Sequence, residues 1–373
     1  MIARLLFALA APSVLDSVIR VLLFCFSSRD HGHDDFEPVD RWLVVIPARD
    51  EGENLDTTLR SLPPDAGQRV RVVVLLDGPD AVGERVAGRY PVIIRQKLPG
   101  GPTKASALRW LAENDRQLIS DSDAVLLLDV GSTLSEHFFD RILWPAGADG
   151  VQTYLRGRGT GVGRAAARSE QFAQVVEDRG RERLGWNIRL RGTGTALRPD
   201  RFLKTVAALS TQVEDLEASL LLSADGARLK MAAGDVWVAD EKPGDVSRAS
   251  SQRARWLAGK LELAVRHIPS MYRLIVRAPL EGVAFVAEMF GRPLVLSVMF
   301  RLVVAAVVVM KAPRSGYEGR ILAAILLASA SVDIGLQIVR SGFGGALELG
   351  GSWLRALLLT PRALLSWMRA RRP

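Results

Sequence analysis

The sequence predicts an α/β domain built on a mostly parallel, doubly wound sheet, with membrane-associated helices at both ends of the chain. Three observations support this prediction. Short apolar runs alternate with helix-length segments between residues 41 and 260. Apolar stretches of nearly membrane-spanning length lie near both ends. The 373 residues, of which 48% are hydrophobic and 24% charged, can bury a large core and are not typical of a disordered chain.

The chain is basic, with a formal net charge of +8. Its arginines are spread along the sequence without a basic stripe interleaved with aromatic residues, so we expect no nucleic-acid partner. A basic chain with apolar ends is typical of binding to an anionic membrane surface and to a phosphate-bearing substrate. The single cysteine, Cys25, excludes an internal disulfide and fits a reducing cytosol. The four histidines lack metal-ligand spacing: His31, His33, His137 and His267.

Residues 1–27 form the first predicted element, an apolar stretch interrupted by Arg4, Asp16 and Arg20. Because no small-residue cleavage site follows it, we expect a membrane anchor or an interfacial helix rather than a removed signal peptide. The polar residues 28–40 predict a linker.

Residues 41–260 hold the predicted α/β domain. Apolar runs bounded by turn residues predict buried parallel strands at residues 42–46, 70–76, 92–94 and 124–128. The segments between them predict helices, joined by right-handed crossovers, at residues 54–61, 80–89 and 103–119. Further along we expect a strand at 151–154, a helix near 168–184, a tight turn at 191–195 and a strand at 236–238.

Residues 261–292 predict amphipathic helices on a membrane surface, and residues 293–341 predict transmembrane helices. Two stretches of the latter, broken only by Arg301 and Asp333, approach the roughly 20 residues that span a bilayer. Residues 342–373 predict a basic amphipathic helix on the cytoplasmic membrane surface. The number of true spans stays open, because the loop that would face outward is basic: Lys311, Arg314 and Arg320.

Acidic residues follow three of the predicted strands: Asp50 with Glu51, Asp77, and Asp129. Ligands of an open parallel sheet bind outside the carboxyl ends of its strands. A single such acid often only caps the next helix, but three at one edge favour a binding site. Because clustered carboxylates repel, this edge should bind a divalent metal with a diphosphate, or a base or ribose with N–H and O–H donors.

Lys104 lies in a glycine-rich loop, GGPTKASAL at residues 100–108, that opens a helix. Backbone N–H groups and a lysine at a helix start favour a phosphate. The spacing is not that of a Walker loop, and a plain surface lysine is the alternative.

The segment TQVED at residues 211–215 begins another predicted helix. Thr211 and Glu214 match a capping box, which gives Glu214 a structural role. Asp215 has no such role. The helix dipole would favour its ionised form, which can accept a proton from an acceptor hydroxyl.

Gln252, Arg255 and Trp256 share one face of a predicted helix through their spacing. The planar guanidinium of Arg255 suits a diphosphate, and Trp256 offers a flat apolar surface to a sugar ring. The alternative is a surface arginine beside a tryptophan that anchors the membrane.

Taken in order, these motifs resemble those of the membrane-integrated family-2 glycosyltransferases, a group that includes the synthases of cellulose, chitin and hyaluronan and enzymes that glycosylate lipids. The similarity covers residues 41–260. It rests on VIPARDE at residues 45–51, with Asp50 where asparagine is usual, on the motifs above, on the turn GTG at 192–194, and on the Q-x-x-R-W signature at 252–256.

The resemblance implies a GT-A fold and inverting transfer of a sugar from a nucleotide-sugar donor, expected to be a UDP-sugar, with Asp215 as the general base. It implies that Asp129 holds Mg²⁺ or Mn²⁺. It implies donor contacts from six residues: Pro47, Glu51, Asp77, Lys104, Asp129 and Arg255. It implies acceptor contacts from six others: Gly192, Thr193, Gly194, Glu214, Gln252 and Trp256.

One motif departs from the family. The family has Asp-x-Asp after the fourth strand, whereas this chain has Asp129-Val-Gly131, so the second metal ligand is missing. Asp123 and Glu136 are candidate substitutes. Weaker metal dependence, or an inactive catalytic domain, would follow from the change.

The expected acceptor is a lipid or a polysaccharide in cell-envelope or exopolysaccharide biosynthesis, at the cytoplasmic face of the inner membrane, with other envelope-biosynthesis subunits as candidate partners. The alternative function is a catalytically weak or inactive subunit that acts as a binding or scaffold component of an envelope glycan complex. A Rossmann-type oxidoreductase is not expected, because no Gly-x-Gly-x-x-Gly turn follows the first strand.

Overall fold

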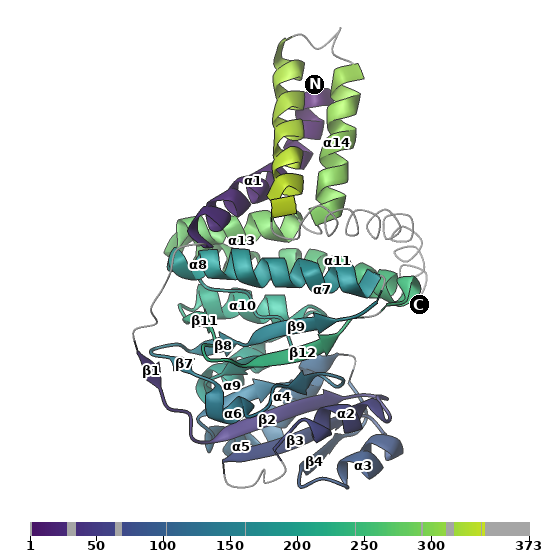
Figure 1. The fold of residues 1–373 in the computed structure, drawn as a ribbon, viewed down its shortest axis with the longest axis vertical. Coiled ribbons are helices and arrows are strands. Elements are labelled where there is room, and N and C mark those ends of the chain that lie inside the picture. The colour runs from purple at the N-terminus through teal and green to yellow at the C-terminus, as the bar shows by residue number, and fades with distance from the viewer. Residues whose placement is uncertain are drawn as a thin grey trace.

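The structure, a computed structural model, has the α/β domain at one end and a group of long helices at the other (Figure 1). The described residues are 2–27, 35–63, 69–101, 103–160, 162–242, 244–291, 294–310, 317–336 and 338–339. The basic helix predicted at 342–373 lies outside the described residues, as do residues 28–34 of the predicted linker.

A seven-stranded sheet forms the centre of the α/β domain, in the order β11-β8-β10-β5-β2-β3-β4. Its core is parallel and consists of β2 (Trp42–Ala48), β3 (Val70–Asp77), β4 (Ile93–Lys97) and β5 (Ala124–Leu127). Three later strands extend it, namely β8 (Gly150–Gln152), β10 (Thr195–Leu197) and β11 (Leu229–Met231). β10 runs antiparallel to both of its neighbours. The predicted mostly parallel α/β sheet is therefore confirmed.

The core strands are apolar along their length because helices cover both faces of the sheet. On one face, Val44 packs in a cluster with residues of α2 (Asn54–Arg60) and α3 (Ala81–Ala87). On the other face, Leu43 packs with residues of α4 (Lys104–Asn114), α5 (Arg116–Ser120), α9 (Pro199–Ala208) and α10 (Glu214–Ala224). This double burial explains why the strands show continuous apolar runs rather than alternation.

Two predicted helices are interrupted. The one expected at residues 103–119 breaks at Asp115, whose carboxylate accepts hydrogen bonds from Arg95 of β4 at 2.7 and 2.8 Å. The one expected near 168–184 contains a π-helical turn, and its parts are α7 (Val162–Phe172), η1 (Ala173–Asp178) and α8 (Arg179–Arg183). A π-helical turn inside a helix often marks a functional region.

Smaller elements border the main sheet. One small sheet has the order β6-β12-β9 and is formed by β6 (Thr133–Leu134), β12 (Trp237–Glu241) and β9 (Tyr154–Arg158). Within the predicted linker, β1 (Phe36–Glu37) pairs with β7 (Trp144–Pro145). A short helix, α6 (Phe138–Arg141), precedes β7.

The other end of the molecule is helical. Its described helices are α1 (Ile2–Ser27), α11 (Val246–Arg266), α12 (Ile268–Arg277), α13 (Pro279–Gly291), α14 (Leu294–Met310) and an unlabelled helix at Tyr317–Leu336. α1 packs against α13, α8 and α14. Figure 1 shows α1, α14 and the yellow-green last helix standing together, away from the sheet.

Two described helices are long and apolar enough to cross a membrane, Leu5–Ser27 and Tyr317–Leu336. The apolar part of α14, Ser297–Met310, is shorter. Length and composition alone give weak support for membrane insertion, because the core helix of a soluble protein passes the same test.

A buried cluster of charged side chains joins these helices. Arg301 of α14 forms an ion pair with Asp333, the residue that interrupts the other apolar stretch. Ser17 of α1 donates to Oδ2 of Asp333 at 2.6 Å, and Nη1 of Arg20 lies 3.3 Å from Oδ1. Nε of Arg20 also lies 3.6 Å from Oε1 of Glu177 in η1. The cluster therefore connects the helical end to the α/β domain.

α1 also contacts the α/β domain through its backbone. A Cβ atom on Gly180 of α8 would lie only 2.4 Å from the carbonyl oxygen of Leu23. Only glycine fits at this crossing, where the two helices touch directly.

Candidate active site

Asp77 ends β3 and is held by groups from two neighbouring segments. The backbone N–H of Gly101 donates to Oδ1 of Asp77 at 2.7 Å, and the guanidinium of Arg49 forms an ion pair with the same carboxylate. Nζ of Lys97 lies 3.7 Å from Oδ1. The sequence did not identify Arg49 or Lys97 as site residues, although Arg49 lies inside the first motif.

The end of β2 carries the residues of that motif. Pro47 is half-buried in the strand, and Asp50 is exposed with a positive φ of 54°. Partial burial raises the pKa of Glu51, and the negative charge of Asp129 raises it further. Glu51 and Asp129 are therefore close enough to interact electrostatically at the carboxyl edge of the sheet.

Lys104 is the first residue of α4, and its ammonium group lies among carboxylates. Thr103 caps this helix through a capping box with Ser106. Nζ of Lys104 lies 2.5 Å from Oδ1 of Asp129 and 3.5 Å from Oε1 of Glu214. The alternative of a plain surface lysine is wrong, because the side chain is largely buried and ion-paired.

The electrostatics of Lys104 follow from these neighbours. Burial lowers the pKa of Lys104, but the charges of Asp129, Glu214 and Asp215 outweigh that effect, and the pKa is raised above its ordinary value. The side chain therefore remains an ammonium ion throughout the neutral range.

The GTG turn lies directly beside Asp129. The backbone N–H of Asp129 donates to Oγ1 of Thr193 at 3.1 Å, and a Cβ atom on Gly192 would lie 3.7 Å from Oδ2 of Asp129. Gly192 and Gly194 both have positive φ angles, 78° and 69°. The buried side chain of Gln152 supports the turn by donating to the carbonyl of Thr193 at 3.0 Å. These contacts place the predicted acceptor turn next to the predicted donor residues.

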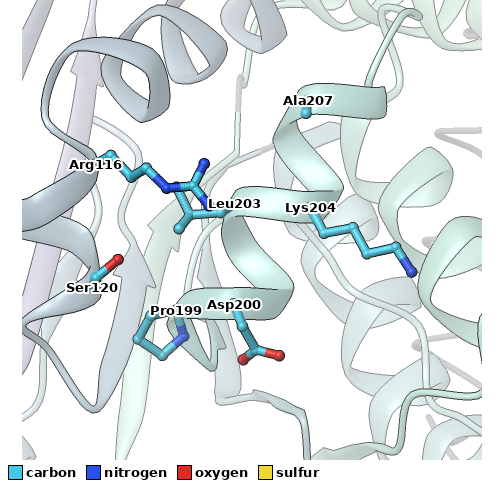
Figure 2. Close-up of a pocket in the computed structure, with 7 residues that line it drawn as sticks. All are labelled: Arg116, Ser120, Pro199, Asp200, Leu203, Lys204 and Ala207. Carbon is cyan, nitrogen blue, oxygen red and sulfur yellow. The ribbon is translucent and has the colours of Figure 1, made fainter.

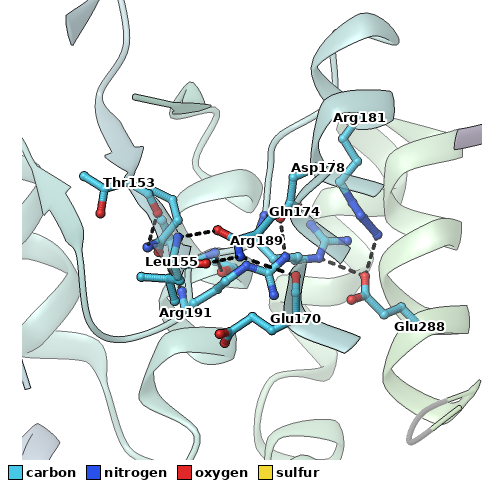
Figure 3. A network of polar contacts seen from close by, with 12 residues as sticks. Thr153, Leu155, Glu170, Gln174, Asp178, Arg181, Arg189, Arg191 and Glu288 are labelled. Atoms are coloured by element: carbon cyan, nitrogen blue, oxygen red, sulfur yellow. Dashed lines mark hydrogen bonds and ion pairs between the residues drawn. The ribbon is translucent and has the colours of Figure 1, made fainter. Parts of the chain in front are cut away.

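Figure 3 shows the polar network behind this turn. Arg191, which precedes the turn, forms an ion pair with Asp178 of η1. Arg181 and Arg189 both donate to Oε2 of Glu288 on α13, at 2.6 and 3.0 Å. The ion pair of Arg191 thus fixes the GTG segment to η1. The contacts to Glu288 hold the neighbouring residues Arg181 and Arg189 against α13.

The predicted capping box at the start of α10 is wrong. The helix begins at Glu214, and Val213 at the N-cap position makes no side-chain cap. The hydroxyl of Thr211 donates instead to Oε2 of Glu217 at 2.8 Å, because Glu217 is fully buried and requires donors. Glu214 is left free to face Lys104, where it belongs to the charge cluster.

Asp215 lies one residue further along α10. Burial, followed by the charge of Glu214, raises the pKa of Asp215 to about 6. Burial and like charges outweigh the opposing effect of the nearby Lys104, yet a group with this pKa is still mostly ionised at neutral pH, as a base requires. A carboxyl group with a pKa near 6 can take up and release a proton near neutral pH.

α11 passes close to this segment. A Cβ atom on Gly259 would lie 2.7 Å from Cγ1 of Val213, two residues before Asp215. Trp256 and Gln252 lie three and seven residues before Gly259, and this spacing puts them on about the same face of the helix. Arg255 and Trp256 are exposed and Gln252 is half-buried. Among the described residues, no hydrogen bond or ion pair joins this signature to the Lys104 cluster.

The site fits a divalent cation that binds together with a diphosphate. Mg²⁺ is commonly held by one or two carboxylates and by substrate phosphates rather than by an all-protein cage. Within the described chain, no group of three metal-ligating side chains is present. Carboxylates nevertheless outnumber the single ammonium of Lys104, so a further cation would relieve their repulsion. Asp129, beside the turn at residues 192–194, is the carboxylate of this cluster that the sequence predicted as a metal ligand.

The proposed replacements for the missing ligand fare less well. Asp123 is wrong as a substitute, because it precedes β5, at the opposite end of that strand from Asp129, and binds the backbone and guanidinium of Arg41 at 2.9 and 2.8 Å. Glu136 is exposed, two residues beyond β6. Gly131 itself has a φ of 88° and open space where a side chain would project.

A separate pocket of about 570 Å³ lies between α5 and α9 (Figure 2). Its lining residues are Arg116, Ser120, Pro199, Asp200, Leu203, Lys204 and Ala207. None of them is a predicted site residue, so this pocket is distinct from the candidate active site.

No protein-family model matches the chain. No curated protein matches it by sequence. A solved structure of a mannosyltransferase from Pyrobaculum calidifontis, in complex with GDP-Man and Mn²⁺, has a TM-score of 0.55 at 14% identity and covers 94% of this chain and 99% of that chain. Glucosyl-3-phosphoglycerate synthase from Mycobacterium tuberculosis has a TM-score of 0.37 at 19% identity, covering 59% and 79%. The chain thus shares the fold of the mannosyltransferase over nearly its whole length, which agrees with the expected GT-A fold.

Proposed function

We propose that this protein is an inverting glycosyltransferase that moves a sugar from a nucleotide-sugar donor to a lipid or polysaccharide acceptor at a membrane surface. One observation carries the proposal. Lys104, Asp129, Glu214 and Asp215, which are far apart in the sequence, form one charge cluster at the carboxyl edge of the sheet. The likeness in fold to a mannosyltransferase supports it.

In the proposed reaction, Asp215 accepts the proton of the acceptor hydroxyl. The acceptor oxygen forms a bond to the anomeric carbon of the sugar while the bond from that carbon to the diphosphate oxygen breaks. The electron pair leaves with the nucleoside diphosphate, and attack from the opposite side inverts the anomeric centre. The raised pKa of Asp215, about 6, suits a general base that works near neutral pH.

The remaining residues bind the two substrates. Asp77, Glu51 and Pro47 surround the proposed position of the nucleoside, and Lys104 and Arg255 hold the diphosphate through charge. A Mg²⁺ or Mn²⁺ ion bound at Asp129 would stabilise negative charge on the leaving diphosphate.

The acceptor is proposed to contact the turn residues and the signature on α11. Gly192, Thr193 and Gly194 would approach it through backbone groups. Glu214, Gln252 and Trp256 would line its path toward Asp215. These roles follow from the resemblance to family-2 enzymes together with the positions described above.

The proposed membrane surface lies along α12. Ile268, Tyr272 and Val276 are one helical turn apart and 60%, 67% and 63% exposed. Arg273 and Arg277 follow them on the same helix. An amphipathic helix with exposed apolar and basic residues is typical of the interface of an anionic bilayer. We propose that this surface binds the cytoplasmic face of the inner membrane, because nucleotide-sugars are made in the cytoplasm.

Radiolabelled transfer tests the proposal directly. Membranes that contain the full chain are incubated with a panel of labelled UDP- and GDP-sugars, and label is sought in the lipid extract and in insoluble polymer. Asp215→Asn should reduce transfer by about 10²–10⁴-fold while donor binding persists. The exposed Asp200, in the pocket between α5 and α9, provides the matched control Asp200→Asn. Normal transfer by Asp215→Asn would refute Asp215 as the base.

The alternative, a binding or scaffold subunit without catalysis, is favoured by one feature, the glycine at position 131. The same experiment separates the two functions. A scaffold would bind a nucleotide-sugar and yet transfer no label from any donor in the panel to lipid, polymer or water.

A further inference from the structure

A buried carboxylate organises the chain just before the proposed base. Glu217 of α10 is fully buried and accepts four hydrogen bonds, each of 2.8 Å. The backbone N–H and hydroxyl of Ser210 donate to Oε1, and those of Thr211 donate to Oε2. We call these four hydrogen bonds between Glu217 and residues 210–211 the clamp. Because a buried carboxylate without donors costs free energy, the clamp resists opening. It fixes the segment that leads into Asp215.

A fifth donor comes from a different part of the chain. Nε2 of His267 lies 2.6 Å from Oε1 of Glu217 and 3.3 Å from the hydroxyl of Ser210. Because Nε2 faces a carboxylate oxygen, this nitrogen carries the imidazole proton. His267 occupies the corner between α11 and α12, fifty residues after Glu217 in the sequence. The corner and the clamp are thereby joined.

The corner also continues directly into the apolar surface of α12. Ile268, the residue after His267, begins the exposed stripe, whereas Leu274 of the same helix is buried in a cluster with Leu220 of α10. α12 thus presents one side to solvent and the other to the helix that carries Asp215. Movement of α12 would act on His267 and through it on Glu217.

We infer that His267 is a positioning residue, which couples the seating of α12 on a lipid surface to the placement of Asp215. When the exposed stripe lies in lipid, the corner between α11 and α12 is held in place. His267 then stays hydrogen-bonded to Glu217, and Glu217 stays hydrogen-bonded to Ser210. Without lipid the corner is less restrained and the clamp opens more often. The inference rests on the proposed function for the role of Asp215, but the linkage itself can be measured without catalysis.

Hydrogen exchange of the two clamped amides tests the linkage. The full chain is compared in detergent and in vesicles of phosphatidylcholine with phosphatidylglycerol, and exchange at Ser210 and Thr211 is followed by mass spectrometry. Vesicles should slow exchange in the wild type and in His267→Gln, whose side-chain amide can still donate to Glu217. His267→Phe should abolish this response to lipid.

Kinetics provide the second readout. If the chain transfers sugar, His267→Phe should lower kcat by up to about 10²-fold with an unchanged Kd for the nucleotide, because the base is misplaced while the donor site is intact. His267→Gln should restore most of the rate.

Three results would decide against the inference or against its premise. Equal exchange of the wild type in detergent and in vesicles would overturn the coupling. Faster exchange throughout the α/β domain of His267→Phe, with kcat and nucleotide affinity lost together, would show a merely structural contact and overturn it as well. A lipid-dependent clamp in a chain that transfers no sugar would refute the proposed function and leave the linkage standing.

Discussion

Nζ of Lys104 lies 2.5 Å from Oδ1 of Asp129, so the residue proposed to hold a metal already has a fixed cation beside it. The same ammonium lies 3.5 Å from Glu214 and lowers the pKa of Asp215. One lysine thus balances carboxylates of the proposed donor side and of the proposed acceptor side together. Changes at Lys104 should therefore alter both halves of the site.

The pH dependence of transfer should report this balance. Because Asp215, as the proposed base, can accept a proton only when it is ionised, the rate should fall as the pH drops through about 6, the pKa of Asp215. Lys104→Met removes a positive charge that lowers this pKa, so the acidic limb of the kcat profile should move to higher pH. Lys204→Met, which breaks an exposed ion pair with Asp225, is the matched control. An unmoved acidic limb in Lys104→Met would show that the two groups do not interact.

A second carboxylate at position 131 should strengthen metal binding. A Cβ on Gly131 would have no neighbour within 4 Å among the described residues, so the side chain of Gly131→Asp fits, although the positive φ strains any residue with a Cβ. Mn²⁺ affinity in the presence of UDP, measured by calorimetry, should rise by about tenfold, or about 1.4 kcal/mol. Gly131→Asn carries the same backbone strain without the charge and should leave the affinity unchanged. Equal affinities of the two variants would place the ion elsewhere.

The two glycines of the acceptor turn should respond differently to alanine. Both have positive φ, which costs roughly 1–2 kcal/mol for a residue with a Cβ. A Cβ on Gly194 would also lie 2.3 Å from Oγ1 of Thr153, whereas a Cβ on Gly192 would meet the side-chain ends of Asp129 at 3.7 Å and of Lys104 at 3.9 Å. Gly194→Ala should therefore lower the melting temperature clearly more than Gly192→Ala. Similar melting temperatures would mean that Thr153 can move away.

Asp215 should cost stability at neutral pH. Its pKa in the folded protein is raised, so the folded state favours the protonated carboxyl, and this stability is present in acid and lost as the pH rises through about 6. Asp215→Asn should therefore melt at a higher temperature than the wild type at pH 7.5, with the difference vanishing near pH 4. Asp200→Asn should show no such pattern. A lower melting temperature for Asp215→Asn at pH 7.5 would contradict the assigned pKa shift.

The charge cluster between the apolar helices should be essential for their assembly. Arg301→Met leaves Asp333 buried with Arg20 and Ser17 as its partners among the described residues, and removal of one member of a buried pair typically costs about 3–5 kcal/mol. The double variant Arg301→Met with Asp333→Leu should recover much of that loss in thermal unfolding in detergent. Arg266→Met, at an exposed ion pair, is the control. If the single variant is as stable as the control, the cluster does not hold the helices.

Local patterns in the sequence predicted the parallel core well. Strands β2, β3 and β5 are buried on both faces, so they show continuous apolar runs that end in acids at one edge. The helix break at Asp115 was not predicted, because it depends on Arg95 from another strand. The spacing of residues within one segment cannot predict a contact with another segment, such as that between Asp115 and Arg95.

In the candidate site too, local patterns were predicted from the sequence and long-range contacts were not. Motif spacing identified Lys104, Asp129 and Asp215, but not that Lys104 would bridge Asp129 and Glu214, because these are long-range contacts. The capping box failed for a related reason, since Thr211 matched a local pattern while a more deeply buried acceptor, Glu217, competed for its hydroxyl. A sequence pattern identifies hydrogen-bond partners only within a short segment. In the folded chain, the burial of each polar group determines which partner it binds.

The glycine at position 180 brings the backbone of the first helix into direct contact with the α/β domain. Because the backbone of α1 rests directly on α8 there, any change of tilt between the first helix and the α/β domain would have to open this contact. If α1 enters the bilayer as proposed, this contact would hold the proposed catalytic edge at a defined distance from the membrane, and an acceptor would have to span that distance. A bulkier residue at this crossing would act as a spacer and alter which acceptor lengths can be used, while leaving the chemistry intact.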